Sequence, residues 1–116
     1  MVIKWKEDCL KTEWIELLLK NPRLVFLALE FANAIGQAIT VTSIFRRSDN
    51  GVHGYWRGID LSVRGFGLSR VEEIVERLNA RYPYDPKRKK MVTYLLHDVG
   101  FGLHLHIQTM TEAKEA

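Results

Sequence analysis

The chain has little cysteine and no long apolar run, and both shortages limit what it can be. Its 116 residues include a single cysteine, Cys9, so no disulfide can form within the chain. A closed structural zinc site usually takes several thiolates, which one cysteine cannot supply. No segment approaches the roughly 18 apolar residues of a membrane-spanning helix, and the N-terminus lacks the apolar core of a signal peptide. The sequence therefore predicts a protein made in the cytoplasm, which needs another export route if it acts outside the cell.

Composition predicts one folded domain over residues 1–116. Hydrophobic residues make up 47% of the chain and no low-complexity run interrupts it, which is enough for a core at this length. The net charge is +3, and basic residues gather in 87–90. Nucleic-acid binding is one interpretation of this run. The absence of interleaved aromatic residues favours a solvated turn instead, and a basic surface would also suit anionic cell-wall polymers.

Apolar spacing predicts three helices, over 12–20, 22–35 and 69–80. Asn21 and Pro22 fit an N-cap followed by proline at the first helical position, and Gly36 ends that helix. Ser69 and Glu72 fit a capping box at the start of the third helix. Strands are expected over 38–45, 57–63, 91–97 and 103–109, with a hairpin turn between the last two. This order predicts an α+β domain with a small, largely antiparallel sheet and helices packed on one side.

The most informative segment is the last strand, which contains His104 and His106. Alternation along a strand places both imidazoles on one face and turns Leu105 and Ile107 into the core. The two histidines then lie about 6 to 7 Å apart. One can bind a metal while the other acts on whatever is bound beside it.

Asp60 lies between apolar neighbours in the strand expected over 57–63, and His53 precedes that strand. A carboxylate in such a place is costly unless it is paired or bound to a cation. His53, Asp60 and one of His104 and His106 would form a three-ligand set of nitrogen and oxygen atoms. Such a set is typical of catalytic zinc, which keeps a fourth position open, although other divalent ions also accept it.

These residues carry a resemblance to a known group of enzymes. His53 and Asp60 resemble the His-x6-Asp motif of the zinc D-Ala-D-Ala peptidases, and His104 and His106 resemble the His-x-His motif of a wider group. That group adds lysostaphin-type endopeptidases, penicillin-insensitive murein endopeptidase and the hedgehog zinc domain. The resemblance covers about residues 39–108 and implies a hedgehog/D-Ala-D-Ala peptidase-like fold. It also implies one zinc ion on His53, Asp60 and His106, with His104 as the catalytic or oxyanion-facing histidine.

A third segment has a counterpart in the same group. Residues 41–46 resemble the strand that ends in Ser-Gly-Tyr-Arg, whose arginine contacts substrate and stabilises developing negative charge. The resemblance gives that role to Arg46, and the alternative is a surface ion pair. Without a signal peptide, the chain is similar to small phage lysins, which leave the cell through holins.

The chain differs from the D-Ala-D-Ala peptidases at several motif positions. It has Gly51, Trp56 and Gly58 where they usually have Ser, Gly and Ala. Leu103 stands where they carry a general-base glutamate, three residues before the last zinc histidine. These differences shift the prediction toward the His-x-His endopeptidases.

Three further polar residues have two interpretations each. His97 fits a residue at the hairpin mouth that forms local hydrogen bonds, which we favour, or one that lines the cleft. Asp98 beside it is a reserve candidate for the general base. Gln108 shares a face with His104 and His106, where it would orient a metal ligand or face solvent.

The sequence as a whole predicts a zinc metallopeptidase or amidase that hydrolyses peptidoglycan-type peptides with metal-activated water. The alternative is a non-catalytic zinc-containing module of the same fold that binds a cell-wall fragment or a partner protein, and Leu103 motivates it. A basic nucleic-acid-associated protein is the third interpretation, supported only by the charge at 87–90.

Overall fold

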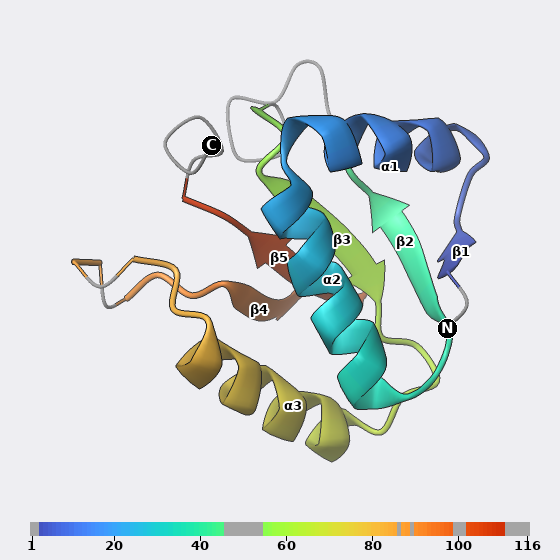
Figure 1. Cartoon of the computed structure of the whole chain (residues 1–116). Coiled ribbons are helices and arrows are strands. Elements are labelled where there is room, and N and C mark those ends of the chain that lie inside the picture. Colours follow the sequence, from blue (N-terminus) through green and yellow to red (C-terminus); the bar gives the residue numbers. More distant parts are fainter. Residues whose placement is uncertain (1–2, 46–54, 86, 89, 99–101, 111–116) are drawn as a thin grey trace.

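Three helices and one five-stranded sheet make up the described part of the chain (Figure 1). The structure is a computed structural model that describes residues 3–45, 55–85, 87–88, 90–98 and 102–110. The elements in chain order are β1 (Ile3–Trp5), α1 (Cys9–Lys20), α2 (Pro22–Ile35), β2 (Ile39–Ser43), β3 (Gly58–Ser62), α3 (Leu68–Arg81), β4 (Tyr94–Asp98) and β5 (Leu103–Gln108).

The sheet is mixed, with strand order β1-β2-β3-β5-β4. Strand β1 pairs parallel with β2, and the pairings β2–β3, β3–β5 and β4–β5 are antiparallel. The largely antiparallel sheet of an α+β domain is therefore confirmed, while the parallel strand β1 was not expected. Strands β3 and β5, which carry the candidate site residues, lie side by side within the sheet.

The helices cover one face of this sheet, with α2 lying across it between α1 and α3 (Figure 1). Leu105 and Ile107 of β5 are fully buried in the core, which confirms the predicted alternation. Tyr94 of β4 also points to the helices, and its hydroxyl donates to the carbonyl oxygen of Leu27 at 2.7 Å. No helix in the described ranges is both long and apolar enough to cross a membrane.

The predicted helices are confirmed, and so is Asn21 as the N-cap residue before Pro22, but the predicted capping box of the third helix is not. Helix α2 ends at Gly36, whose φ of 70° is the left-handed conformation that glycine adopts most easily. Asn21 occupies the N-cap position, yet its side chain makes no capping hydrogen bond. Helix α3 follows Gly67, so Ser69 lies inside its first turn and the predicted capping box with Glu72 is wrong.

The side chain of Asn21 instead ties the helices to the sheet. It is buried, and its amide donates to the carbonyl oxygen of Trp56 and to the hydroxyl of Thr109, both at 2.9 Å. Trp56 lies just before β3 and Thr109 just after β5. One amide group therefore connects the α1–α2 corner to the adjacent ends of the two central strands.

Trp56 has a backbone conformation that is unusual for a large residue. Its φ of 59° lies in the left-handed region, which costs about 1–2 kcal/mol for a residue other than glycine. Its ring stacks on Phe45, with ring centroids 4.5 Å apart and an interplanar angle of 13°. This stacking and the hydrogen bond from Asn21 hold the turn that leads into β3.

Candidate metal centre

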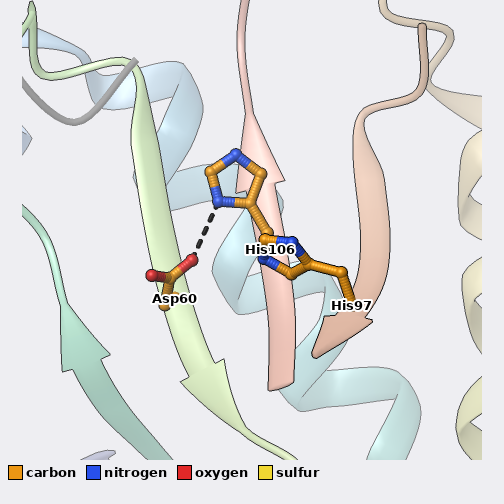
Figure 2. Close-up of side chains that lie close together, drawn as sticks. All are labelled: Asp60, His97 and His106. Atoms are coloured by element: carbon orange, nitrogen blue, oxygen red, sulfur yellow. Dashed lines mark hydrogen bonds and ion pairs between the residues drawn. The ribbon is translucent and has the colours of Figure 1, made fainter. Parts of the chain in front are cut away.

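Asp60 and His106 face each other across the two central strands. They are register partners in the β3–β5 pairing, and Asp60 Oδ1 lies 2.8 Å from His106 Nδ1 (Figure 2). Only 3% of Asp60 and 7% of His106 is exposed. Because a buried carboxylate needs a positive partner, this pair is the electrostatic centre of the site.

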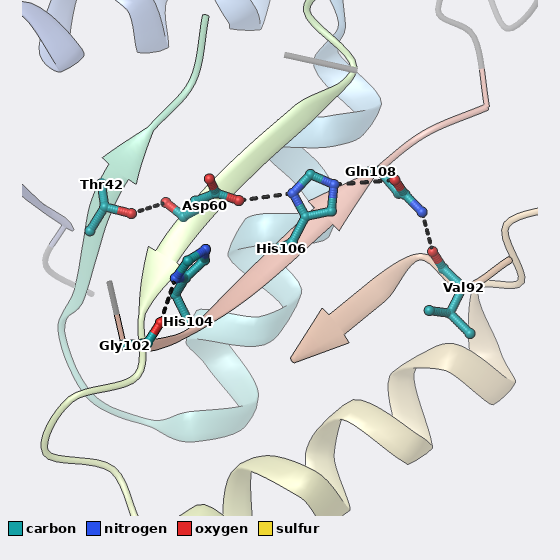
Figure 3. A network of polar contacts seen from close by, with 7 residues as sticks. All are labelled: Thr42, Asp60, Val92, Gly102, His104, His106 and Gln108. Atoms are coloured by element: carbon teal, nitrogen blue, oxygen red, sulfur yellow. Dashed lines mark hydrogen bonds and ion pairs between the residues drawn. The ribbon is translucent and has the colours of Figure 1, made fainter. Parts of the chain in front are cut away.

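His106 is held on its other side by Gln108. Its Nε2 lies 3.1 Å from Gln108 Oε1, and the Gln108 amide nitrogen donates to the carbonyl oxygen of Val92 at 2.8 Å. The bond to Val92 fixes the amide so that its oxygen faces the imidazole. Figure 3 shows the resulting chain of contacts across the open face of the sheet, from Thr42 through Asp60, His106 and Gln108 to Val92.

Both ring nitrogens of His106 therefore face oxygen acceptors. A doubly protonated imidazolium satisfies both contacts. A neutral imidazole that carries its proton on Nε2 also does so when a cation binds at Nδ1, on the Asp60 side. In that second form Gln108 has the role that carbonyl oxygens commonly have behind metal-bound histidines.

His97 of β4 joins this pair to form a group that can hold a metal ion. One ligand atom from each of Asp60, His97 and His106 lies within 4.8 Å of the others, and the ring centroids of His97 and His106 are 5.4 Å apart. Two ligands of a tetrahedral zinc ion are about 3.3 Å apart. The Asp60–His106 contact at 2.8 Å is slightly shorter than this, and all three ligand atoms lie within 4.8 Å of one another, so the group is close to the size that one ion needs.

His104 lies at the edge of the same group. Its ring centroid is 4.8 Å from that of His97, and its Nδ1 lies 3.1 Å from the carbonyl oxygen of Gly102. Because a carbonyl only accepts, Nδ1 is the donor and the neutral ring keeps its lone pair on Nε2. The side chain is half-buried, and this nitrogen is suited to accept a proton.

A groove of about 960 Å³ opens beside the group, over β2 and β3. Asp60 and His104 line it together with Thr42 and Ser62. A volume of this size is typical of sites that take small-molecule or short peptide ligands. The groove gives such a ligand access to both Asp60 and His104.

The structure brings some of the predicted site residues together and leaves others apart. Asp60, His104, His106 and Gln108 lie on one face, as expected from alternation. Asp98 is paired with Leu103, so the pleat turns it to the opposite face, where its carboxylate accepts from the backbone N–H of Gly102.

Two of the predicted residues, His53 and Arg46, lie outside the described residues. The predicted ligand set therefore overlaps the observed group at Asp60 and His106.

His97 is the site residue that sequence reasoning gave the lesser weight. The sequence favours a local role at the hairpin mouth, whereas the structure places its ring against those of His104 and His106. A signal was present, since alternation in a hairpin makes His97 a cross-strand partner of His104. The preceding Leu95 and Leu96 hid this alternation, because apolar residues there point to both faces.

Comparison with protein-family models, with curated proteins and with solved structures finds no match for this chain. The function of this chain is therefore inferred from its motifs and from the geometry of the group.

Proposed function

We propose that the protein is a zinc-dependent hydrolase of peptide-type amide bonds, acting on peptidoglycan-like peptides. The observation that carries the proposal is the group of Asp60, His97 and His106, which can hold a metal ion beside a groove. The peptide substrate and the hedgehog/D-Ala-D-Ala peptidase-like fold come from the motif resemblance, which includes Asp60 and His106.

The conformation of Trp56 also supports the resemblance. This residue stands where the D-Ala-D-Ala peptidases usually have glycine, and its φ of 59° is one that favours glycine. The turn before Asp60 thus has a backbone shape consistent with the motif, although the side chain differs.

Asp60 and His106 are ligands in every version of the proposal, and the third ligand is a histidine. The motif order names His53, and the geometry of the described residues names His97. In either case Gln108 Oε1 accepts from His106 Nε2 and leaves Nδ1 for the ion. Zinc bound there would act as a Lewis acid on the scissile carbonyl.

The chain's own residues supply the rest of the proposed reaction. His104 accepts a proton at Nε2 from the attacking water, whose oxygen bonds to the carbonyl carbon. The C–N bond then breaks and the proton passes to the departing amine. Arg46 is proposed to bind a substrate carboxylate or the developing oxyanion.

A non-catalytic zinc module is a second candidate because the structure brings His97 to Asp60 and His106, in addition to the His53 that the motif names. If His53 and His97 both bind, they give four protein ligands with Asp60 and His106, and zinc with four protein ligands has no open position. Leu103, in place of the usual glutamate, fits the same interpretation. Such a protein would bind cell-wall fragments or a partner without cleaving them.

Metal analysis beside cleavage assays separates these possibilities. We expect about one zinc per chain, lost in His106→Ala and retained in His104→Ala, with muropeptide cleavage abolished in both. His53→Ala and His97→Ala identify the third ligand, and loss of zinc from both would indicate the closed site. Zinc bound in neither the wild type nor any variant after reconstitution would remove the proposal.

A further inference from the structure

The groove beside the metal-capable group is polar in its middle and mainly apolar at one end. Thr42 and Asp60 line it where β2 and β3 run side by side, and the register partners Ser62 and His104 line it further along. Beyond this pair, where β3 ends and β5 begins, most of the lining side chains are apolar. The proposed reaction uses the polar middle and gives this apolar end no role.

Five apolar side chains from three parts of the chain form the apolar end. They are Val63, Phe66, Leu68, Val71 and Leu103. Val71 is fully buried and the ring of Phe66 packs on that of Phe31, with centroids 6.4 Å apart, so both are held by the core. Leu68 and Leu103, in contrast, are 52% and 41% exposed. Large apolar side chains that remain exposed in a groove, next to buried ones, are typical of a surface that a ligand covers.

The position of the apolar end indicates which part of a ligand would cover it. One groove extends from Asp60 to Leu68 and Leu103, and each residue of an extended peptide advances about 3.3 Å. Ser62, which lies two residues beyond Asp60 on β3, already borders the apolar end. A peptide with one amide bond at the metal-capable group therefore reaches this end within two or three residues, and the hydroxyls of Thr42 and Ser62 can bond to its backbone on the way.

We infer that the apolar end of the groove binds a large aliphatic side chain of the peptide, two or three residues from the bond that is cut, with Leu68 and Leu103 as its main contacts. This inference rests on the proposed function, which supplies the peptide, and it adds a specificity that the motif resemblance does not contain. Binding would remove apolar surface of both the ligand and the two leucines from water. An alanine at the same position of the peptide is too short to cover them.

The test is a calorimetric titration of the full chain, after zinc reconstitution, with N-acetyl-tetraalanine amide and with the four peptides that carry one leucine in place of an alanine. Each peptide is made from L- and from D-residues. At one position we expect leucine to bind at least about tenfold more tightly than alanine, with a more negative heat-capacity change because apolar surface is buried. The double variant Leu68→Ser/Leu103→Thr should lose most of this preference and keep its zinc. Both side chains are partly exposed, so the fold should persist, which circular dichroism checks.

A matched control separates the effect of the groove from the general loss of exposed leucine. Leu18→Ser/Leu19→Thr makes the same two changes on α1, where these leucines are 49% and 79% exposed and do not line the groove, and it should keep the full preference. Four results would overturn the inference: equal binding of the alanine peptide and every leucine peptide, a preference that survives in Leu68→Ser/Leu103→Thr, equal losses in both double variants, or no binding of any peptide.

Cleavage of the same peptides is followed in parallel by mass spectrometry. A leucine preference that depends on Leu68 and Leu103, without zinc or cleavage, would keep the inference about the groove and remove the proposed hydrolase. Cleavage of all the peptides alike, without any leucine preference in binding, would do the reverse.

Discussion

At the scale of single residues, Asp60 has the most demanding position in the site. It is a carboxylate only 3% exposed at the centre of β3, and leaving such a charge without compensation costs several kcal/mol. The ring of His106 lies against it, with Nδ1 at 2.8 Å. A carboxylate whose burial costs this much free energy, and which lies next to two other possible metal ligands, is a strong candidate for a functional residue.

Replacing this carboxylate tests its role. Asp60→Asn should keep the volume and lower zinc affinity by more than about a hundredfold, since even changes behind metal ligands cost 10- to 100-fold. Competition with a chromophoric chelator measures the affinity. Asp98→Asn makes the same chemical change on the other face of the sheet and should leave affinity unchanged; equal affinities for the two variants would contradict the assignment.

Gln108 is predicted to act through His106. Gln108→Ala removes the acceptor from His106 Nε2 and should weaken zinc binding about 10- to 100-fold, measured with the same chelator. Gln108→Glu keeps an oxygen that can accept from His106 Nε2 but loses the N–H that donates to Val92, so it should recover only part of the affinity. An unchanged affinity in Gln108→Ala would show that its contact with His106 has only a structural role.

The sequence predicted which residues share a face of the sheet, but not which side chains of different strands contact each other. Alternation alone was enough for His104, His106 and Gln108, because they follow one another on a single strand. The contact between Asp60 and His106 depends on strand register. Register between strands far apart in the chain is set by packing of the whole domain, which one local pattern does not encode.

At the scale of elements, helices were easier to predict than strand ends. Helix α2 carries several signals at once, including Pro22 at its start and Gly36 at its end. Strand β1 has three residues, too few for alternation to be seen, and it depends on pairing with β2. Residues 91–93 were expected in a strand because they are apolar or β-branched, yet β4 begins only at Tyr94.

The entry to β3 offers a test at this scale. Trp56→Gly and Trp56→Ala both lose the stacking on Phe45, so their difference reports on the backbone alone. With φ at 59°, the glycine variant should be more stable than the alanine variant by about 1 kcal/mol, from urea denaturation. At a position with the usual negative φ, alanine would be the more stable of the two. A more stable alanine variant would therefore contradict the left-handed conformation of Trp56.

At the scale of the whole molecule, Tyr94 connects the sheet to the helix layer. Its side chain is 1% exposed and donates to Leu27. Burial, and secondarily the negative charge of Glu30, raises the pKa of this phenol above its usual value of 10. The hydrogen bond between Tyr82 and Glu30, together with desolvation, raises the pKa of Tyr82 as well.

This shift predicts a loss of stability in alkali. Above about pH 10 the unfolded phenol releases its proton while folded Tyr94 keeps it, so the free energy of unfolding falls by up to about 1.4 kcal/mol per pH unit. Tyr94→Phe should lower stability at neutral pH by about 1 kcal/mol and flatten this dependence, leaving the part due to Tyr82. Denaturant titrations between pH 7 and 11 measure it, and parallel curves for the two proteins would exclude Tyr94 as the cause.

Asn21 lies between α1 and α2. Its amide affects the alignment of β3 and β5, and with it the site on the opposite face of the sheet. If β3 and β5 slipped past each other by one residue, Asp60 would face Leu105 or Ile107 in place of His106, and the strand that moved would turn its polar residues toward the helices. The Asn21 amide donates to Trp56 and to Thr109 at once. A slip of β3 against β5 would break at least one of these two hydrogen bonds. The corner between α1 and α2 thus helps to fix the alignment of the two strands that carry Asp60 and His106.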